Sequence, residues 1–388
     1  VGGGDGPLCT PLIHAGRVIT FGAQGVLSCH DAASGKLLWR RETHRDFETS
    51  ADRILQLAQR TRADLVVIEI CPFAGLLCDT LSDAGFRVAV VNTSHDRYLR
   101  RDIRAKTDLK DAIRLLEMAH EDPDGLPTVH VPDRATRQWR RQIAFRSILQ
   151  QRLVMAKNSL RAILASADVH LPRSNKAWSK QFRAELQAIA ASLDGVASVE
   201  ASIELEQIGM LERHLATHTA SLDEVGKSNP TVQLLKTAYG VGPRVAEVFA
   251  AWIADPRRFR NGKQVGAYFG LVPRVHQSGQ SCRHGSITRS GSSHARWMLV
   301  QAAWVAVRKK ESWARHVYER AMRGSKTRKR VALIAVARRL AVRLWAMMKR
   351  NEAWREDASE SATASPPHPA RAASSADAAG PMLRACLS

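Results

Sequence analysis

The chain has 388 residues, and its 58 Lys and Arg against 37 Asp and Glu give a formal net charge of +21. This length exceeds what one hydrophobic core usually serves, so we expect two or three domains. A hydrophobic fraction of 45% excludes a largely disordered chain, and the positive charge favours a polyanionic partner such as nucleic acid. The longest apolar stretch, residues 297–307, is too short to span a membrane. Six cysteines without metal-type spacing fit a reducing, cytoplasmic compartment.

Residues 1–45 alternate short strand-like runs with turns, and the clearest runs are residues 17–21 and 26–29. The succession Ala33-Ser34-Gly35-Lys36 followed by Trp39 resembles one repeat of a quinoprotein-type β-propeller. A single blade cannot bury its own face, and no second copy follows, so a quinone-dependent dehydrogenase would need several more blades. We interpret residues 1–45 as a propeller-like fragment foreign to the rest of the chain.

Residues 46–130 change to an α/β pattern. Apolar runs at residues 64–70 and 87–92 are typical of buried strands. Helical periodicity precedes them at 51–62, lies between them at 71–85 and follows at 107–120. A strand, helix, strand succession predicts a parallel sheet. Glu69 ends the first of these strands, where a buried carboxylate is costly unless it faces a site or has a partner. Glu69 could also be an ordinary surface residue at a strand end.

A second acidic element follows at the start of the next helix. Asp108 and Asp111 are three residues apart and therefore share one helix face. Two like charges repel there unless a cation lies between them, although Asp108 and Thr107 could also act as a plain helix cap. Carboxylates at a strand end and a helix start form an all-oxygen site suited to Mg²⁺ or Mn²⁺ and to phosphoryl transfer.

The second half of the chain divides into a helical arm, a basic domain and a tail. Residues 134–225 carry Leu, Ile and Ala at helical spacing with a break at 170–174, which predicts an antiparallel coiled-coil arm. Residues 230–350 hold 25 Lys and Arg against four Asp and Glu, and this surplus of 21 equals the net charge of the whole chain. Such a localised surplus is typical of phosphate binding. Residues 352–388 are rich in Ala, Ser and Pro and are predicted to be disordered.

The basic domain opens with two glycines between two helical patterns. Gly240 and Gly242 flank Val241, as in the turn of a helix-hairpin-helix element, whose free N–H groups can meet a phosphate. An ordinary tight turn explains the pattern equally well. The remainder of residues 230–350 is predicted to be mainly α-helical.

Two ordered sets of motifs run through residues 50–350. The first set contains Val67-Ile68-Glu69, Gly85-Phe86-Arg87-Val88, Val91-Asn92 and Lys106-Thr107-Asp108 with Asp111-Ala112. The second set contains Gly240-Val241-Gly242, Phe259 to Lys263, Gly270-Leu271-Val272-Pro273-Arg274, Gln277-Ser278-Gly279, Gly285 to Gly291 and His294-Ala295-Arg296. In order and spacing, both sets resemble insertion-sequence transposases related to the Piv/MooV DNA invertases.

That resemblance implies a fold and a set of site residues. It implies an RNase H-like domain, similar to a Holliday-junction resolvase, whose Asp-Glu-Asp-Asp set binds divalent metal; Glu69, Asp108 and Asp111 match the last three acids. It also implies a serine nucleophile, which maps to Ser278, with Ser281, Ser286 and Ser290 as neighbouring competitors. The residues predicted to bind nucleic acid are Lys106, Gly240, Gly242, Arg244, Arg274, Arg283, Arg289 and Arg296.

One departure from the family concerns the first acid. The family places an Asp on its opening strand, but residues 17–25 contain no acid. Asp31 and Asp46 are the nearest candidates, and their contexts are a turn and a helix lead-in. The metal set is therefore expected to lack one ligand.

These features predict a DNA transposase or site-specific recombinase that cuts and rejoins the ends of an insertion element. We expect it to act as a homo-oligomer in the cytoplasm, associated with the nucleoid, and the resemblance implies guidance by an RNA encoded by the element. The alternative is a catalytically impaired remnant that only binds nucleic acid, which the missing first acid favours.

Overall fold

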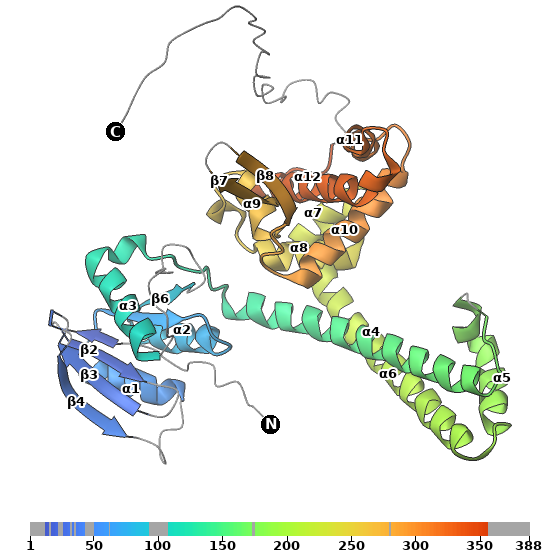
Figure 1. The fold of residues 1–388 in the computed structure, drawn as a ribbon, viewed down its shortest axis with the longest axis horizontal. Coiled ribbons are helices and arrows are strands. Elements are labelled where there is room, and N and C mark those ends of the chain that lie inside the picture. Colours follow the sequence, from blue (N-terminus) through green and yellow to red (C-terminus); the bar gives the residue numbers. More distant parts are fainter. Residues whose placement is uncertain are drawn as a thin grey trace, which may run out of the picture. The chain divides into compact units, whose positions relative to one another are not determined.

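Figure 1 shows the fold of the chain in a computed structural model. The structure describes residues 12–14, 17–21, 26–31, 33–34, 36–42, 50–61, 63–92, 108–172, 175–278 and 281–355. The chain forms two compact units, Val1–Glu224 and Val225–Ser388. Within the described ranges, no helix combines the length and hydropathy that crossing a bilayer requires. The predicted tail beyond residue 355 lies outside these ranges.

A six-stranded sheet, in the order β4-β3-β2-β1-β5-β6, organises the first unit. Its strands are β1 (Leu12–His14), β2 (Arg17–Phe21), β3 (Val26–Asp31), β4 (Leu37–Glu42), β5 (Leu65–Glu69) and β6 (Arg87–Val91). The strands β1 to β4 form an antiparallel meander, whereas β5 and β6 are parallel. Because β1 is antiparallel to both β2 and β5, β2 runs parallel to β5.

Helices cover both faces of the β5–β6 part of the sheet. Residues of a strand alternate between its faces, and Val66 and Ile68 of β5 pack in one core with α1 (Ala51–Thr61) and α2 (Ala74–Asp83). Val67, which faces the other way, packs in a second core with α3 (Asp108–Glu121). The strands and helices expected between residues 51 and 121 are thus confirmed, with ends shifted by a few residues.

The strands of residues 17–42 belong to the same sheet as β5 and β6. The sequence instead predicts a separate fragment over residues 1–45. The motif that resembles a propeller blade is the turn between β3 and β4, where Asp31 accepts hydrogen bonds from Ser34 N (2.8 Å) and Ser34 Oγ (2.7 Å). The side-chain bond, followed by the backbone bond, lowers the pKa of Asp31. An aspartate-capped turn between two strands suits any hairpin, so this local pattern does not identify a propeller.

The helical arm of the first unit consists of α4 (Arg134–Ser166), α5 (Lys180–Ala191) and α6 (Gly195–Ser228). Asp133 caps α4 by accepting a hydrogen bond from Thr136 N (2.8 Å). Buried residues of α4 recur at intervals of three and four, which keeps one stripe facing the partner helix: Leu149, Leu153, Ala156, Leu160 and Leu164. Between α4 and α5 the chain forms the short helix η2 (Asn175–Trp178).

Polar contacts along the arm show that α4 and α6 run antiparallel. His218 Nε2 donates to Gln142 O (2.9 Å) near one end, and Lys157 Nζ lies 2.9 Å from Glu212 Oε1 further along. Figure 1 shows the two long helices side by side. The helical arm expected at residues 134–225 is therefore present, while its coiled-coil supercoil stays a prediction.

The second unit packs its other helices around the last one, α12 (Lys329–Arg350). Buried small and aliphatic residues such as Ala337, Leu340 and Ala341 let these helices approach closely. The elements before α12 are α7 (Pro230–Lys236), α8 (Pro243–Ile253), α9 (Gly262–Tyr268), β7 (Pro273–Ser278), β8 (Ser281–Ile287), α10 (Ser293–Arg308) and α11 (Trp313–Met322). Short helices η1 (Pro123–Gly125), η3 (Pro256–Arg258) and η4 (Lys326–Arg328) complete the two units.

Candidate metal and nucleic-acid sites

Glu69 is the last residue of β5 and is partly buried. It follows Val67 by two positions and therefore lies on the face of the sheet that Val67 shares with Leu115 and Met118 of α3. Asp108 is the first residue of that same helix, and Asp111 follows in its first turn. Glu69 thus belongs to the face of the sheet that α3 covers, and not to the face that α1 and α2 cover.

The side chains of Asp108 and Asp111, like all of Lys106, lie outside the described part of the structure. Among the side chains that are described, no three His, Cys, Asp or Glu residues gather closely enough to hold a metal ion. Because two of the three predicted ligands are not among them, the metal site stays a prediction.

Strand register identifies the position on β2 at which a first acid would share a face with Glu69. Through β1, Ile19 of β2 is level with Val66 of β5, since both pair with Leu12. Continuing by one residue, Thr20 is level with Val67 and belongs to the face of Glu69, whereas Phe21 is level with Ile68 on the other face. The face to which a position of β2 belongs depends on strand pairing, which only the folded sheet defines.

The Gly240–Gly242 turn joins α7 to α8 and contacts α10. Gly240 has φ +86°, and an added Cβ would lie 2.9 Å from Ala302 O and 3.1 Å from Ala306 N of α10. Gly242 is the N-cap of α8, with an ordinary φ of −80°, and a Cβ there would meet nothing within 4 Å. Gly240 is therefore explained by close packing, whereas the structure shows no such constraint at Gly242.

Several predicted nucleic-acid contacts have intramolecular partners. Arg244 Nη2 lies 3.1 Å from Oε1 of Glu247, whose side chain is only 1% exposed. Arg274 Nη2 is 3.5 Å from Thr288 O. Arg289 is exposed, with φ +58°. Arg244 neutralises a buried carboxylate. Binding of nucleic acid by these three arginines stays a prediction.

Arg296 holds the base of the β7–β8 hairpin together. Its Nη1 donates to Phe269 O (3.2 Å) and Ser290 O (2.9 Å). Burial, with a smaller contribution from the charge of Arg289, lowers the pKa of Arg296. At the same place an added Cβ on Gly270 would lie 2.5 Å from Ser290 N. The motifs around residues 270 and 290 therefore fix the two ends of the hairpin, a role that sequence reasoning did not identify.

Ser278 ends β7, where it pairs with Ser281 at the start of β8. The side chains of Ser278 and Arg283 lie outside the described residues, as do residues 279 and 280. The backbone alone places the predicted nucleophile at the tip of a two-stranded hairpin anchored by Arg296. Within the described residues, no further strand pairs with the edges of this hairpin.

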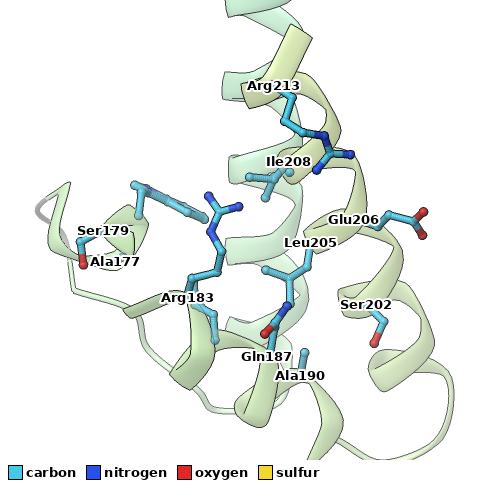
Figure 2. A pocket seen from close by; sticks show the side chains of 13 residues that line it. Ala177, Ser179, Arg183, Gln187, Ala190, Ser202, Leu205, Glu206, Ile208 and Arg213 are labelled. Atoms are coloured by element: carbon cyan, nitrogen blue, oxygen red, sulfur yellow. The ribbon is translucent and has the colours of Figure 1, made fainter. Parts of the chain in front are cut away.

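A cavity of about 400 Å³ lies in the arm, between η2, α5 and α6. Figure 2 shows side chains of all three elements lining it, including Arg183 and Leu205. Arg183 also forms an ion pair with Glu212, and burial, which acts to raise the pKa of Glu212, is outweighed by hydrogen bonds from Lys157 and Arg183 that lower it. Glu69, the predicted catalytic residue whose side chain the structure describes, does not line this cavity.

Comparisons with known proteins give two matches in succession along the chain. A transposase family model of the IS110 DEDD type matches residues 27–167, and a model for the transposase IS116/IS110/IS902 family matches residues 232–319. The first match begins within β3, so the β3–β4 hairpin is included in it. The interpretation of this hairpin as a propeller fragment has no support from the structure or from these matches.

Relatives align with most of the chain. The probable family 20 transposase of Pseudomonas aeruginosa is 28% identical over 305 residues, which cover 75% of this chain and 86% of that protein. The transposase for insertion sequence element IS1111A of Coxiella burnetii is 24% identical over 333 residues, 83% of this chain and 86% of that protein. The pilin gene-inverting protein of Moraxella bovis is 30% identical over 124 residues, 32% of this chain and 38% of that protein. Both family matches, in order and together with these relatives, place the chain in the IS110/IS116 family of transposases.

Proposed function

We propose that the chain catalyses DNA transposition, using a divalent-metal carboxylate site in the first unit and Ser278 in the second. The observation that carries this proposal is the position of Glu69, at the end of a strand and on the face covered by the helix that begins with Asp108. A meander of antiparallel strands followed by strands parallel to β2 also supports an RNase H-like assignment of the sheet.

The residues present suit a hard divalent cation. Glu69, Asp108 and Asp111 offer only carboxylate oxygens, the ligands that Mg²⁺ and Mn²⁺ prefer. When bound there, such a cation would supply positive charge that stabilises the negative charge developing on a transferring phosphoryl group. The protein's own part is to hold the acids on one side of β5, next to a core that excludes water.

Ser278 is the proposed nucleophile for strand exchange. Attack of its Oγ on a backbone phosphate would form a serine–phosphate ester and break one phosphate–sugar bond, with the sugar oxygen receiving a proton. Arginines near the hairpin, including Arg274 and Arg289, would stabilise the charge that develops on the phosphate. A second sugar hydroxyl can then attack this ester, which forms a new phosphate–sugar bond, breaks the serine–phosphate bond and returns a proton to the Ser278 oxygen.

Strand exchange requires several DNA ends to be held together, so we expect a homo-oligomer. The family resemblance further implies an RNA transcribed from the element as guide, acting in the cytoplasm at the nucleoid. A second function, nucleic-acid binding without cleavage, is favoured by the absence of any acid in β2.

The test is excision and rejoining on a plasmid that carries the chain's gene with its native flanking DNA, with and without Mg²⁺. We expect metal-dependent cleavage, loss of strand transfer in Ser278→Ala, and retention of it in Ser281→Ala, which alters the residue paired with Ser278. Metal-dependent strand transfer that survives Ser278→Ala would refute the serine assignment. Binding without any cleavage would establish the remnant instead.

A further inference from the structure

The outer face of α10 exposes two large aromatic side chains. Trp297 is 56% exposed and Trp304 is 40% exposed. Seven residues apart, they lie on one face of the helix, about 10 Å apart along its axis. The buried residues of α10 are on the opposite side, where Ala295, Leu299, Ala302 and Ala306 pack in the core. Neither tryptophan is therefore needed to fill the core of its unit.

Neighbouring rings support both tryptophans from the side. His294 stacks on Trp297 with ring centroids 6.3 Å apart and planes 25° apart, and Trp252 lies 6.4 Å from His294. The ring of Trp304 is 6.5 Å from that of Tyr318. Such contacts restrict the rotamers of the exposed rings, which lowers the entropy that a ligand stacking on them would have to overcome.

Positive charge adjoins these rings. Arg308 is on the same helix face, one turn beyond Trp304 and exposed. The helix itself contains no Asp or Glu. Exposed aromatic rings with a cation beside them are a combination that binds single-stranded nucleic acid.

We propose that the α10 face, defined by Trp297, Gln301, Trp304 and Arg308, is a stacking platform for unpaired bases of a nucleic-acid strand. The bases stack on the tryptophan rings, and Arg308 contacts a flanking phosphate. A duplex keeps its base faces occupied by neighbouring base pairs, so the platform discriminates in favour of unpaired strands. This inference rests on the proposed function only in taking nucleic acid as the ligand.

The test uses the full chain in EDTA, where metal-dependent cleavage cannot occur, so its outcome is separate from that of the proposed activity. Fluorescence anisotropy would measure Kd for labelled oligothymidylate and oligouridylate of about 20 nucleotides, longer than the site of a single binding module, and for a duplex of equal length. The variants are Trp297→Ala, Trp304→Ala, the double variant, and the phenylalanine substitutions. Val331→Ala, at a site that is 56% exposed on α12, is the control.

We expect each alanine variant to weaken single-strand binding about tenfold, with duplex binding and the salt dependence unchanged. The phenylalanine variants should stay within about threefold of the original chain because a flat ring remains. Arg308→Gln should weaken both ligands and reduce the salt slope by about one. A stronger effect on oligothymidylate or on oligouridylate identifies the strand as DNA or RNA.

Equal losses for single strand and duplex, or no loss for either, would overturn the platform. Sedimentation of the double variant gives a further outcome that would overturn it. If the double variant forms a smaller oligomer and this change accounts for its weaker binding, the face is an interface between copies of the chain. A loss that the Val331→Ala control reproduces would also count against it.

Discussion

The two halves of the molecule differ in how they use charge. Residues 230–350 carry a surplus of 21 positive charges, whereas the rest of the chain balances 33 Lys and Arg against 33 Asp and Glu. In the first unit one partly buried acid, Glu69, stands beside a helix that begins with another. In the second unit many cations are exposed, but others have structural partners. The first unit thus contains the acids of the predicted metal site, whereas the second unit contains the excess of positive charge that a polyanion would attract.

Several arginines of the second unit bind groups within the protein, so fewer cations are available to phosphates than the net charge suggests. Arg258 donates to Ile253 O (3.0 Å) and lies over the ring of Phe259, and Arg296 holds two loop carbonyls. Arg343 lies between the rings of Trp313 and Trp354, 4.8 Å and 4.7 Å from their centres. We therefore expect fewer counterions to be released on binding than the charge count suggests.

The largest effect should come from removing the strand-end acid. Glu69→Gln should lower Mg²⁺-dependent cleavage by about 1000-fold or more, since a metal ligand and its charge are lost, while DNA affinity stays unchanged. Asp64→Asn is the matched control because Asp64 is exposed and precedes the other end of β5. Cleavage rates and Kd measured on the same DNA distinguish the two roles. Equal losses in both variants would contradict a site at Glu69.

The glycine turn of the second unit gives the next largest effect. Gly240→Ala should destabilise the unit by about 2 kcal/mol, because φ is positive and the new Cβ meets the backbone of α10. Gly242→Ala should cost about 0.5 to 1 kcal/mol, because alanine is a poorer N-cap than glycine. Urea unfolding followed by tryptophan fluorescence measures both, since six of the nine tryptophans lie in this unit. If Gly242→Ala is stable yet weakens DNA binding, the turn contacts phosphate; similar stabilities for both variants would refute the packing argument.

An acid added to β2 tests the register of the sheet. Thr20→Asp should raise cleavage about tenfold by supplying a further carboxylate on the face of Glu69. Phe21→Asp is the paired comparison, because position 21 belongs to the other face and should give no gain. Cleavage should be titrated with Mg²⁺, and tighter metal dependence is expected for Thr20→Asp alone. A gain only in Phe21→Asp would mean that the register is shifted by one residue.

The smallest effect concerns the arm. Hydrogen bonds from Lys157 and Arg183 lower the pKa of Glu212 despite the opposing effect of burial, so its carboxylate stabilises the arm above the ordinary glutamate pKa of about 4.3. Glu212→Gln should cost about 1 kcal/mol or less at neutral pH, since the partners are partly exposed. The difference from the original chain should vanish as pH falls through the lowered pKa. A pH-independent difference in thermal unfolding would exclude the ion pairs as its cause.

The sequence by itself determined the elements and the division of charge. Apolar runs located β5 and β6, helical spacing located α1 to α3 and the arm, and counting residues located the basic region. These features depend on local periodicity and composition, which neighbouring residues alone specify. Glu69 and Asp108 were identifiable for the same reason, as an acid after a buried run and an acid at a helix start.

Tertiary structure decided what depends on residues far apart in sequence. Pairing through β1 places Thr20, and not Phe21, on the face of Glu69, because a shift of one residue reverses the face of every position in a strand. The hairpin at residues 26–42 joined the α/β sheet because its strand partners, and not its turn motif, define its fold. Arg296 and Gly240 have packing roles set by Ser290 and Ala302, which lie on other segments. Local sequence specifies where a helix or strand forms, but the neighbours it meets across the fold are specified only when the chain is packed.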